Sequence, residues 1–279
     1  MPAISRRAFL SSAYLSVALL SAQGGITSLA GPALAARGPR RPRVYTRSEW
    51  QADPPENKAE VLDRAPDRLV VHHTATANTG AADLAAAFRL SRSIQRYHMR
   101  HNGWEDIGEQ FTVSRGGYVM EGRNRSLPAA EAGRHVLGAQ VADHNDHTLG
   151  VETEGTYTSC LPPARQLSAL TSLLAWLCDA YGLDPQVAVI GHRDLNRTAC
   201  PGDRLYAYLP QLRADVVRRL GGRAPRRPGA APPRLALPDG SGDLSGDLSG
   251  GGTALVGDLP FEHGPAVGPH DLTRHPRVL

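Results

Sequence analysis

The 279-residue chain has little excess charge of either sign, which argues against a nucleic-acid-binding protein. Lys and Arg together number 31 and Asp and Glu 27, so the formal net charge is +4. Residues 44–220 hold 19 Lys and Arg against 21 Asp and Glu, and the positive excess lies outside them. Nucleic-acid binding normally requires a clustered basic patch. We therefore predict an ordinary solvated surface over residues 44–220 and no nucleic-acid partner.

The chain also lacks an apolar run long enough to cross a membrane, for which about 20 residues are needed. The apolar run Ala13–Leu20 is short and is followed by Ser, Gln and Gly. The pair Arg6-Arg7 precedes it, and Ala33-Leu34-Ala35 offers small residues typical of a cleavage site. We predict that residues 1–35 are a twin-arginine signal peptide and 36–43 a linker. The mature protein would then be secreted, with no stable membrane span.

Large apolar residues become scarce from Gly221 onward, where Pro, Gly, Ser, Asp and Ala dominate. A short duplication lies inside this region, at 242–245 and 246–249. So little apolar surface cannot offset the entropy lost on ordering the chain. We predict that residues 221–279 are a disordered Gly/Pro-rich tail.

Residues 44–220 alternate between strand patterns and helix patterns. β-Branched and apolar residues, or short alternating runs, predict strands at 68–73, 110–113, 118–121, 149–153 and 187–190, the second and third forming a hairpin. Runs rich in Ala, Leu and Arg predict helices at 81–99, 164–181 and 204–220. Thr79 could cap the first helix, and Pro163 suits the first turn of the second. The predicted fold class is α/β, a single domain with a central mixed β-sheet flanked by helices.

Cysteines number only three, and one of them stands in the most informative stretch of the chain. Cys200 lies eight residues after His192 and directly before a Pro-Gly turn. A pair of histidines, His72-His73, lies far upstream on a predicted strand, where neighbouring side chains point to opposite faces. Two imidazole nitrogens and one thiolate suit zinc, and three protein ligands leave a position open, as in catalytic sites.

The other two cysteines leave two alternatives open. Cys160 and Cys178 could pair in the oxidising exterior. Cys178 could instead be a free, buried thiol on the core face of its helix.

Six motifs in order resemble those of type 2 N-acetylmuramoyl-L-alanine amidases and peptidoglycan recognition proteins. They are Arg47-Ser48-Glu49-Trp50, 71–76, 102–108, 117–123, 149–152 and 191–202. The resemblance runs from about Val44 to Leu220 and implies the amidase/peptidoglycan-recognition fold. It also implies that the zinc ligands are His72, His192 and Cys200, whereas His73 faces away towards packing or a hydrogen bond.

The resemblance further implies a zinc amidase acting on peptidoglycan or muropeptides at the cell wall, and we predict that the secreted protein is a monomer. Such an enzyme hydrolyses the amide between the muramoyl lactyl group and L-alanine. The alternative is a recognition module that binds peptidoglycan without cutting it, although non-catalytic relatives commonly lack the residue matching Cys200. A third possibility keeps the zinc chemistry and targets another amide bond.

Three residues are candidates for catalysis. Glu152 matches a catalytic glutamate of one branch and would act as general base and then acid, unless it is a solvent-facing strand residue. Glu109 replaces a tyrosine of the recognition branch. It is either a polar group near zinc that raises the pKa of a neighbouring carboxyl, or an exposed residue. Thr198 could stabilise the developing oxyanion or merely stabilise a turn.

Two further residues, His135 and Asn145, occupy loop positions that line the substrate groove in relatives. Arg193 and Asp194, beside the expected ligand His192, would hold the loop as an internal ion pair.

Overall fold

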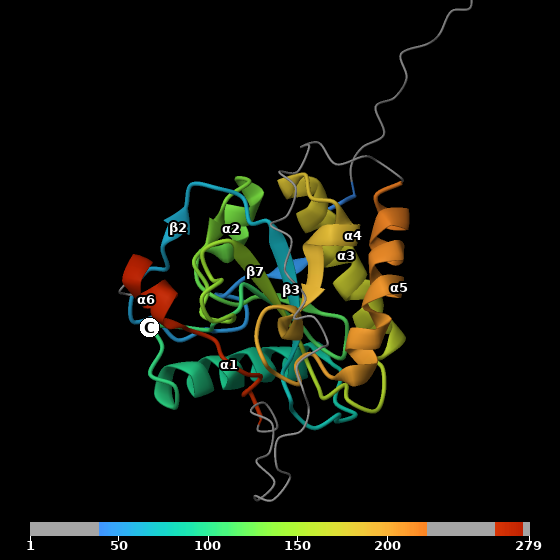
Figure 1. Ribbon diagram of the computed structural model, residues 1–279. Helices are drawn as coiled ribbons and strands as arrows, with labels where there is room; N and C mark the ends of the chain where they lie inside the picture. The colour runs from blue at the N-terminus through green and yellow to red at the C-terminus, as the bar shows by residue number, and fades with distance from the viewer. Residues whose placement is uncertain (1–38, 222–259, 276–279) are drawn as a thin grey trace, which may run out of the picture. The chain divides into compact units, whose positions relative to one another are not determined.

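The computed structural model of the protein describes residues 39–221 and 260–275 (Figure 1). The predicted signal peptide and most of the predicted tail lie outside the described residues. Within these two ranges, no helix has the length and apolar character needed to cross a membrane.

Six strands form one mixed sheet in the order β1-β5-β4-β7-β3-β8. Only β4 and β5 pair antiparallel, as the predicted hairpin, and the other neighbours run parallel. The strands are β1 (Val44–Tyr45), β3 (Arg68–His73), β4 (Phe111–Val113), β5 (Val119–Glu121), β7 (Thr148–Thr153) and β8 (Val189–Gly191). Two short strands, β2 (Val61–Leu62) and β6 (His135–Val136), form a separate antiparallel pair. The predicted mixed sheet is confirmed.

Three long helices lie close to the predicted positions: α1 (Leu84–Arg100), α3 (Ala164–Tyr181) and α5 (Asp203–Arg219). The cap of α1 is Asp83 and not Thr79, because the Asp83 carboxylate accepts a 2.7 Å hydrogen bond from the Ala86 N–H. The strand expected from Val187 starts later, because Asp184 caps a short helix, α4 (Pro185–Ala188). Shorter elements are α2 (Ser126–Glu131), a 3₁₀ turn (His192–Asp194) and α6 (Pro269–Arg274).

The alternation of side chains along each strand separates the two faces of the sheet. Leu69 and Val71 of β3 and Val151 of β7 belong to the main core, together with the apolar faces of α3 and α5. Helices α3 and α5 lie side by side on this face (Figure 1). His72 must therefore point to the opposite face. Glu152 is its register partner on the neighbouring strand β7 and shares that face.

The predicted disorder of residues 221–279 is wrong for residues 260–275. Few of these residues are apolar, and hydrogen bonds to distant loops order them instead. The Phe261 N–H donates to the Thr74 carbonyl at 2.8 Å, and Asn145 donates to the Ala266 carbonyl at 2.7 Å. Helix α6 follows, shown in red in Figure 1. Composition missed this order because the interaction partners come from other parts of the chain.

Candidate metal centre

His72 is buried near the end of β3, and its ring is oriented by a glutamine. The His72 Nε2–H donates to Gln140 Oε1 at 2.6 Å, and Gln140 in turn donates from Nε2 to Thr148 Oγ1 at 2.7 Å. The proton on Nε2 leaves the lone pair on Nδ1, which lies 3.6 Å from the sulfur of Cys200. His72 thus presents an unprotonated nitrogen towards Cys200.

His192 and Cys200 come from the loop that follows β8. His192 starts the 3₁₀ turn, and its Nε2 lies 3.1 Å from the carbonyl oxygen of Pro265 and 3.1 Å from Asn196 Oδ1. The Nδ1 of His192 is buried and has no hydrogen-bond partner among the described residues. Cys200 is fully buried as well. The three ligands predicted from the sequence are therefore brought together.

The loop is held differently from the prediction. Arg193 does not pair with Asp194: its guanidinium pairs with Asp203 at 2.7 Å and donates to the carbonyl of Cys200 at 3.3 Å. Asp194 turns back instead and accepts from the Gly191 N–H at 2.8 Å and from the Tyr206 hydroxyl. These bonds fix the backbone on both sides of the two ligands.

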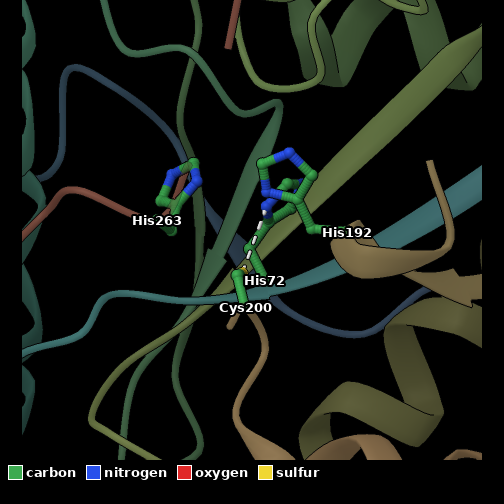
Figure 2. A group of neighbouring side chains, drawn as sticks. All are labelled: His72, His192, Cys200 and His263. Atoms are coloured by element: carbon green, nitrogen blue, oxygen red, sulfur yellow. Dashed lines mark hydrogen bonds between the residues drawn. The ribbon is translucent and has the colours of Figure 1, made fainter. Parts of the chain in front are cut away.

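A fourth ligand-type residue, His263, joins the cluster from the C-terminal segment. His72, His192, Cys200 and His263 each offer one ligand atom, and these atoms all lie within 4.8 Å of one another (Figure 2). No local pattern in the sequence marks His263, which stands in a Gly/Pro-rich stretch.

The chemistry of the cluster fits a zinc ion. Buried polar atoms normally find partners, and an unmet one costs about 1–3 kcal/mol. Here the buried Nδ1 atoms of His192 and His263 have no hydrogen-bond partner in the described part of the chain. Imidazole nitrogens and a thiolate are the donors that zinc prefers.

Two buried carboxylates flank the cluster. His263 Nε2 lies 2.8 Å from Glu109 Oε1 and 3.3 Å from Glu152 Oε2. Burial raises the pKa of Glu152 to about 7; His263 opposes the rise and the negative charge of Glu109 adds to it. Burial would also raise the pKa of Glu109, but His98 and His263 outweigh it and lower this pKa to about 2. The pKa of Glu152 thus lies near neutrality, and the neighbouring carboxylate of Glu109 stays ionised at that pH.

Burial excludes the solvent-exposed alternative that the sequence left open for each of these glutamates. Glu109 and Glu152 are both fully buried, so neither is the solvent-facing residue considered above. Glu154 lies beyond the end of β7 and accepts a 2.6 Å hydrogen bond from the Arg115 N–H. It is not a member of the ligand cluster.

The remaining site residues have the following surroundings. The Thr198 hydroxyl donates to the His263 carbonyl at 2.5 Å and accepts from the Cys200 N–H at 3.1 Å. The ring of His73 accepts from the Tyr157 N–H at 3.3 Å, consistent with the prediction that it faces away. These contacts give Thr198 a place in the loop, and its oxyanion role stays a prediction.

The structure gives Asn145 and His135 structural contacts. Asn145 Oδ1 accepts from the Gln140 N–H at 2.8 Å, and its amide donates to the C-terminal segment. The ring nitrogens of His135 lie 2.9 Å from the Arg64 carbonyl oxygen and 3.2 Å from that of Asp146, and the ring is not part of the ligand cluster. Substrate contact by either residue stays a prediction.

All three cysteines are free thiols, so Cys160 and Cys178 form no disulfide. Cys160 is exposed and Cys178 is buried, which is the second of the two alternatives for this pair.

Comparisons with known proteins agree with the fold. Residues 62–203 match the family described as N-acetylmuramoyl-L-alanine amidase. The pig N-acetylmuramoyl-L-alanine amidase is 37% identical over 67% of this chain, and this chain spans about a third (31%) of that protein. The structure of wild-type Drosophila PGRP-LB superposes with a TM-score of 0.53 at 28% identity, over 60% of this chain and 92% of that one. Peptidoglycan recognition protein-LE in complex with tracheal cytotoxin, a monomeric diaminopimelic acid-type peptidoglycan, gives a TM-score of 0.52 at 28% identity, over 60% and 92%.

Proposed function

Because this chain belongs to the N-acetylmuramoyl-L-alanine amidase family, we propose that it is a zinc-dependent amidase. It would hydrolyse the amide between the muramoyl lactyl group and L-alanine of peptidoglycan. The observation that carries the proposal is the position of Glu152, a buried carboxyl with a pKa raised by burial, beside the cluster of His72, His192 and Cys200.

Each residue of the site has a separate task in this proposal. His72, His192 and Cys200 would hold the metal. Bound zinc would polarise the scissile carbonyl and lower the pKa of the attacking water. Glu152 would take a proton from that water and deliver it to the nitrogen of the departing L-alanine, serving as base and then acid. A pKa near neutrality suits both halves of this task, and Thr198 would donate a hydrogen bond to the developing oxyanion.

Glu109 would act through Glu152. It is ionised at neutral pH because His98 and His263 together lower its pKa despite its burial. Its fixed negative charge favours the protonated form of Glu152, which is the form that must donate to the leaving amine.

We further propose that the substrate is peptidoglycan or a muropeptide and that the protein acts as a secreted monomer at the cell wall. The complex of recognition protein-LE with tracheal cytotoxin supports this class of ligand. In this proposal residues 1–35 are the twin-arginine signal peptide, 36–43 are a linker and 44–220 are the amidase domain. Asn145 and His135 would contribute to the groove.

A substitution of Glu152 tests the function most directly. Glu152→Gln should lower the rate of muropeptide hydrolysis by about 10²–10⁴-fold, the usual contribution of general acid–base catalysis, and leave bound zinc unchanged. Glu154→Gln is the matched control, because Glu154 is near in sequence but outside the cluster. Mass spectrometry should detect free lactyl-muramoyl glycan and the L-alanine-terminated peptide. Intact muropeptide retained by wild-type protein would favour a recognition module, and other product masses would indicate another amide bond.

A further inference from the structure

The segment 260–275 crosses the candidate site, and backbone hydrogen bonds anchor it on both sides of His263. Before the imidazole, the Phe261 N–H donates to the Thr74 carbonyl at 2.8 Å, next to the end of β3. After it, the Ala142 N–H donates to the Pro265 carbonyl at 3.1 Å. The backbone therefore holds this part of the segment in place without help from the imidazole.

A second anchor lies further along the segment, at a buried carboxylate. Asp271 accepts from the Asp143 N–H at 2.7 Å and from Asn145 Nδ2 at 3.0 Å. The same carboxylate accepts from the Gly268 N–H at 3.0 Å and so caps helix α6. Asn145 is one of the two residues predicted to meet substrate, so the segment uses a hydrogen-bonding group that substrate would need.

Each histidine of the cluster uses one ring nitrogen in the same way. The Nε2 of His72 binds Gln140, that of His192 lies near the Pro265 carbonyl, and that of His263 lies between two carboxylates. Metal-ligating histidines usually donate their second N–H to such acceptors, which directs the other nitrogen towards the metal.

The Nδ1 atom of His263 fits the role of a ligand. Like that of His192, it is buried and has no hydrogen-bond partner within residues 39–221 and 260–275. The Nε2–H can be donated to Glu109, 2.8 Å away, while Nδ1 in its unprotonated form binds a metal, so carboxylate binding and metal binding are compatible on one ring.

We propose that His263 is a fourth protein ligand of the metal and that residues 260–275 thereby hold the domain in a latent form. Four protein ligands make the closed tetrahedral site typical of structural zinc, with no position open for water or a substrate carbonyl. The same ring lies 3.3 Å from the carboxyl of Glu152, the proposed acid–base, and the backbone carbonyl of His263 accepts a hydrogen bond from the Thr198 hydroxyl. Substrate would have to displace the segment before hydrolysis.

This inference rests on the proposed zinc site, and the experiment separates the two. The full chain is loaded with Co²⁺ in place of zinc, and its absorption spectrum is recorded. Thiolate-to-cobalt charge transfer tests whether Cys200 binds the ion, which is the proposed site. The ligand-field bands test whether His263 binds as well. We expect His263→Ala to change the ligand-field bands and to preserve the charge-transfer band.

A second variant displaces the segment and retains the imidazole. Gly264 has a φ of +118°, and a Cβ added there would lie 2.6 Å from Thr198 Cβ. Gly264→Val should therefore expel the segment and reproduce the spectral change of His263→Ala. His270→Ala is the matched control, because His270 is an exposed histidine of the same segment, and its spectrum should equal that of the wild type.

The latent state also predicts a gain of activity. Gly264→Val, which expels the segment, should raise kcat/KM on a muropeptide by roughly tenfold or more, the rise expected when nine-tenths of the molecules are closed. Ligand-field bands unchanged in both variants would overturn the fourth ligand, and a fall of kcat/KM in Gly264→Val would overturn latency. A wild-type spectrum without the thiolate band would instead overturn the proposed metal site and, with it, this inference.

Discussion

The side-chain oxygen of Gln140 accepts a 2.6 Å hydrogen bond from Nε2 of His72 and thereby selects the tautomer of this histidine. The Gln140 amide cannot turn around freely, because its nitrogen donates to Thr148 Oγ1 at 2.7 Å. The oxygen therefore faces the imidazole, and the lone pair of His72 stays on Nδ1. A residue that touches no metal thus decides whether His72 can bind one.

Removal of this acceptor should weaken metal binding. We expect Gln140→Ala to lower zinc affinity by about 10–100-fold, the usual effect of losing the hydrogen-bond partner of a ligating histidine. Competition with a chromophoric chelator measures the affinity. Gln186→Ala, at an exposed glutamine, serves as the control. Equal affinities for Gln140→Ala and the wild type would contradict the tautomer argument.

Gly108 should tolerate no side chain, because the backbone of Ala139 lies too close to it. A Cβ there would lie 2.1 Å from the carbonyl oxygen of Ala139, and this contact cannot be relieved by turning a side chain. Gly108→Ala should lower the free energy of unfolding by about 1–3 kcal/mol or more, as for an overpacked core. At Gly80 nothing lies within 4 Å of the added Cβ, so Gly80→Ala should be neutral or slightly stabilising. Urea unfolding of both variants measures the difference.

The pH dependence of hydrolysis should move when the second carboxylate is neutralised. The charge of Glu109 raises the pKa of Glu152, in addition to the larger effect of burial. Glu109→Gln removes this negative charge, so the pKa of Glu152 should fall. Glu152 then ionises at lower pH, and the acidic limb of kcat/KM, which requires the base form, should shift to lower pH. Glu131→Gln, on the exposed surface, should leave the limb in place. An unshifted limb in Glu109→Gln would show that Glu109 does not act on the catalytic group.

The three cysteines should differ sharply in reactivity. The thiolate is the reactive form, and burial raises the pKa of Cys178 to about 12. At pH 8 only about one Cys178 in 10⁴ is then ionised. Cys200 is fully buried as well, so the reagent cannot reach its sulfur in the folded protein. Ellman's reagent should therefore react promptly with Cys160 alone in the folded protein and with all three thiols after unfolding. Prompt reaction that persists in Cys160→Ser would contradict this ranking.

Much of the fold follows from local patterns, and these patterns together with the family resemblance indicate three of the proposed metal ligands. The strand Arg68–His73 is a run of apolar and β-branched residues that ends in two histidines, and the helix Ala164–Tyr181 matches its predicted bounds. His192 and Cys200 share one short loop, so their proximity is a property of the local chain. Such features can be read from neighbours in the sequence, because period and spacing determine which side chains face together.

The surroundings of these ligands depend on distant parts of the chain. Gln140 meets His72 across 68 positions, and Glu109 meets His263 across 154. Glu109 and Glu152 are buried, and the histidines whose effect on the pKa outweighs burial at Glu109 but not at Glu152 lie beside them, only after the sheet and the C-terminal segment come together. No periodic pattern encodes such contacts.

The sequence by itself determined the strands, the long helices and the three-ligand motif, because these depend on side chains close together in the chain. Only the tertiary structure decided the tautomer of His72 and the position of His263 beside the cluster. It also decided that Glu109 and Glu152 lie next to His263. The segment 260–275 lacks the apolar residues that composition can detect, and backbone hydrogen bonds to remote loops order it instead.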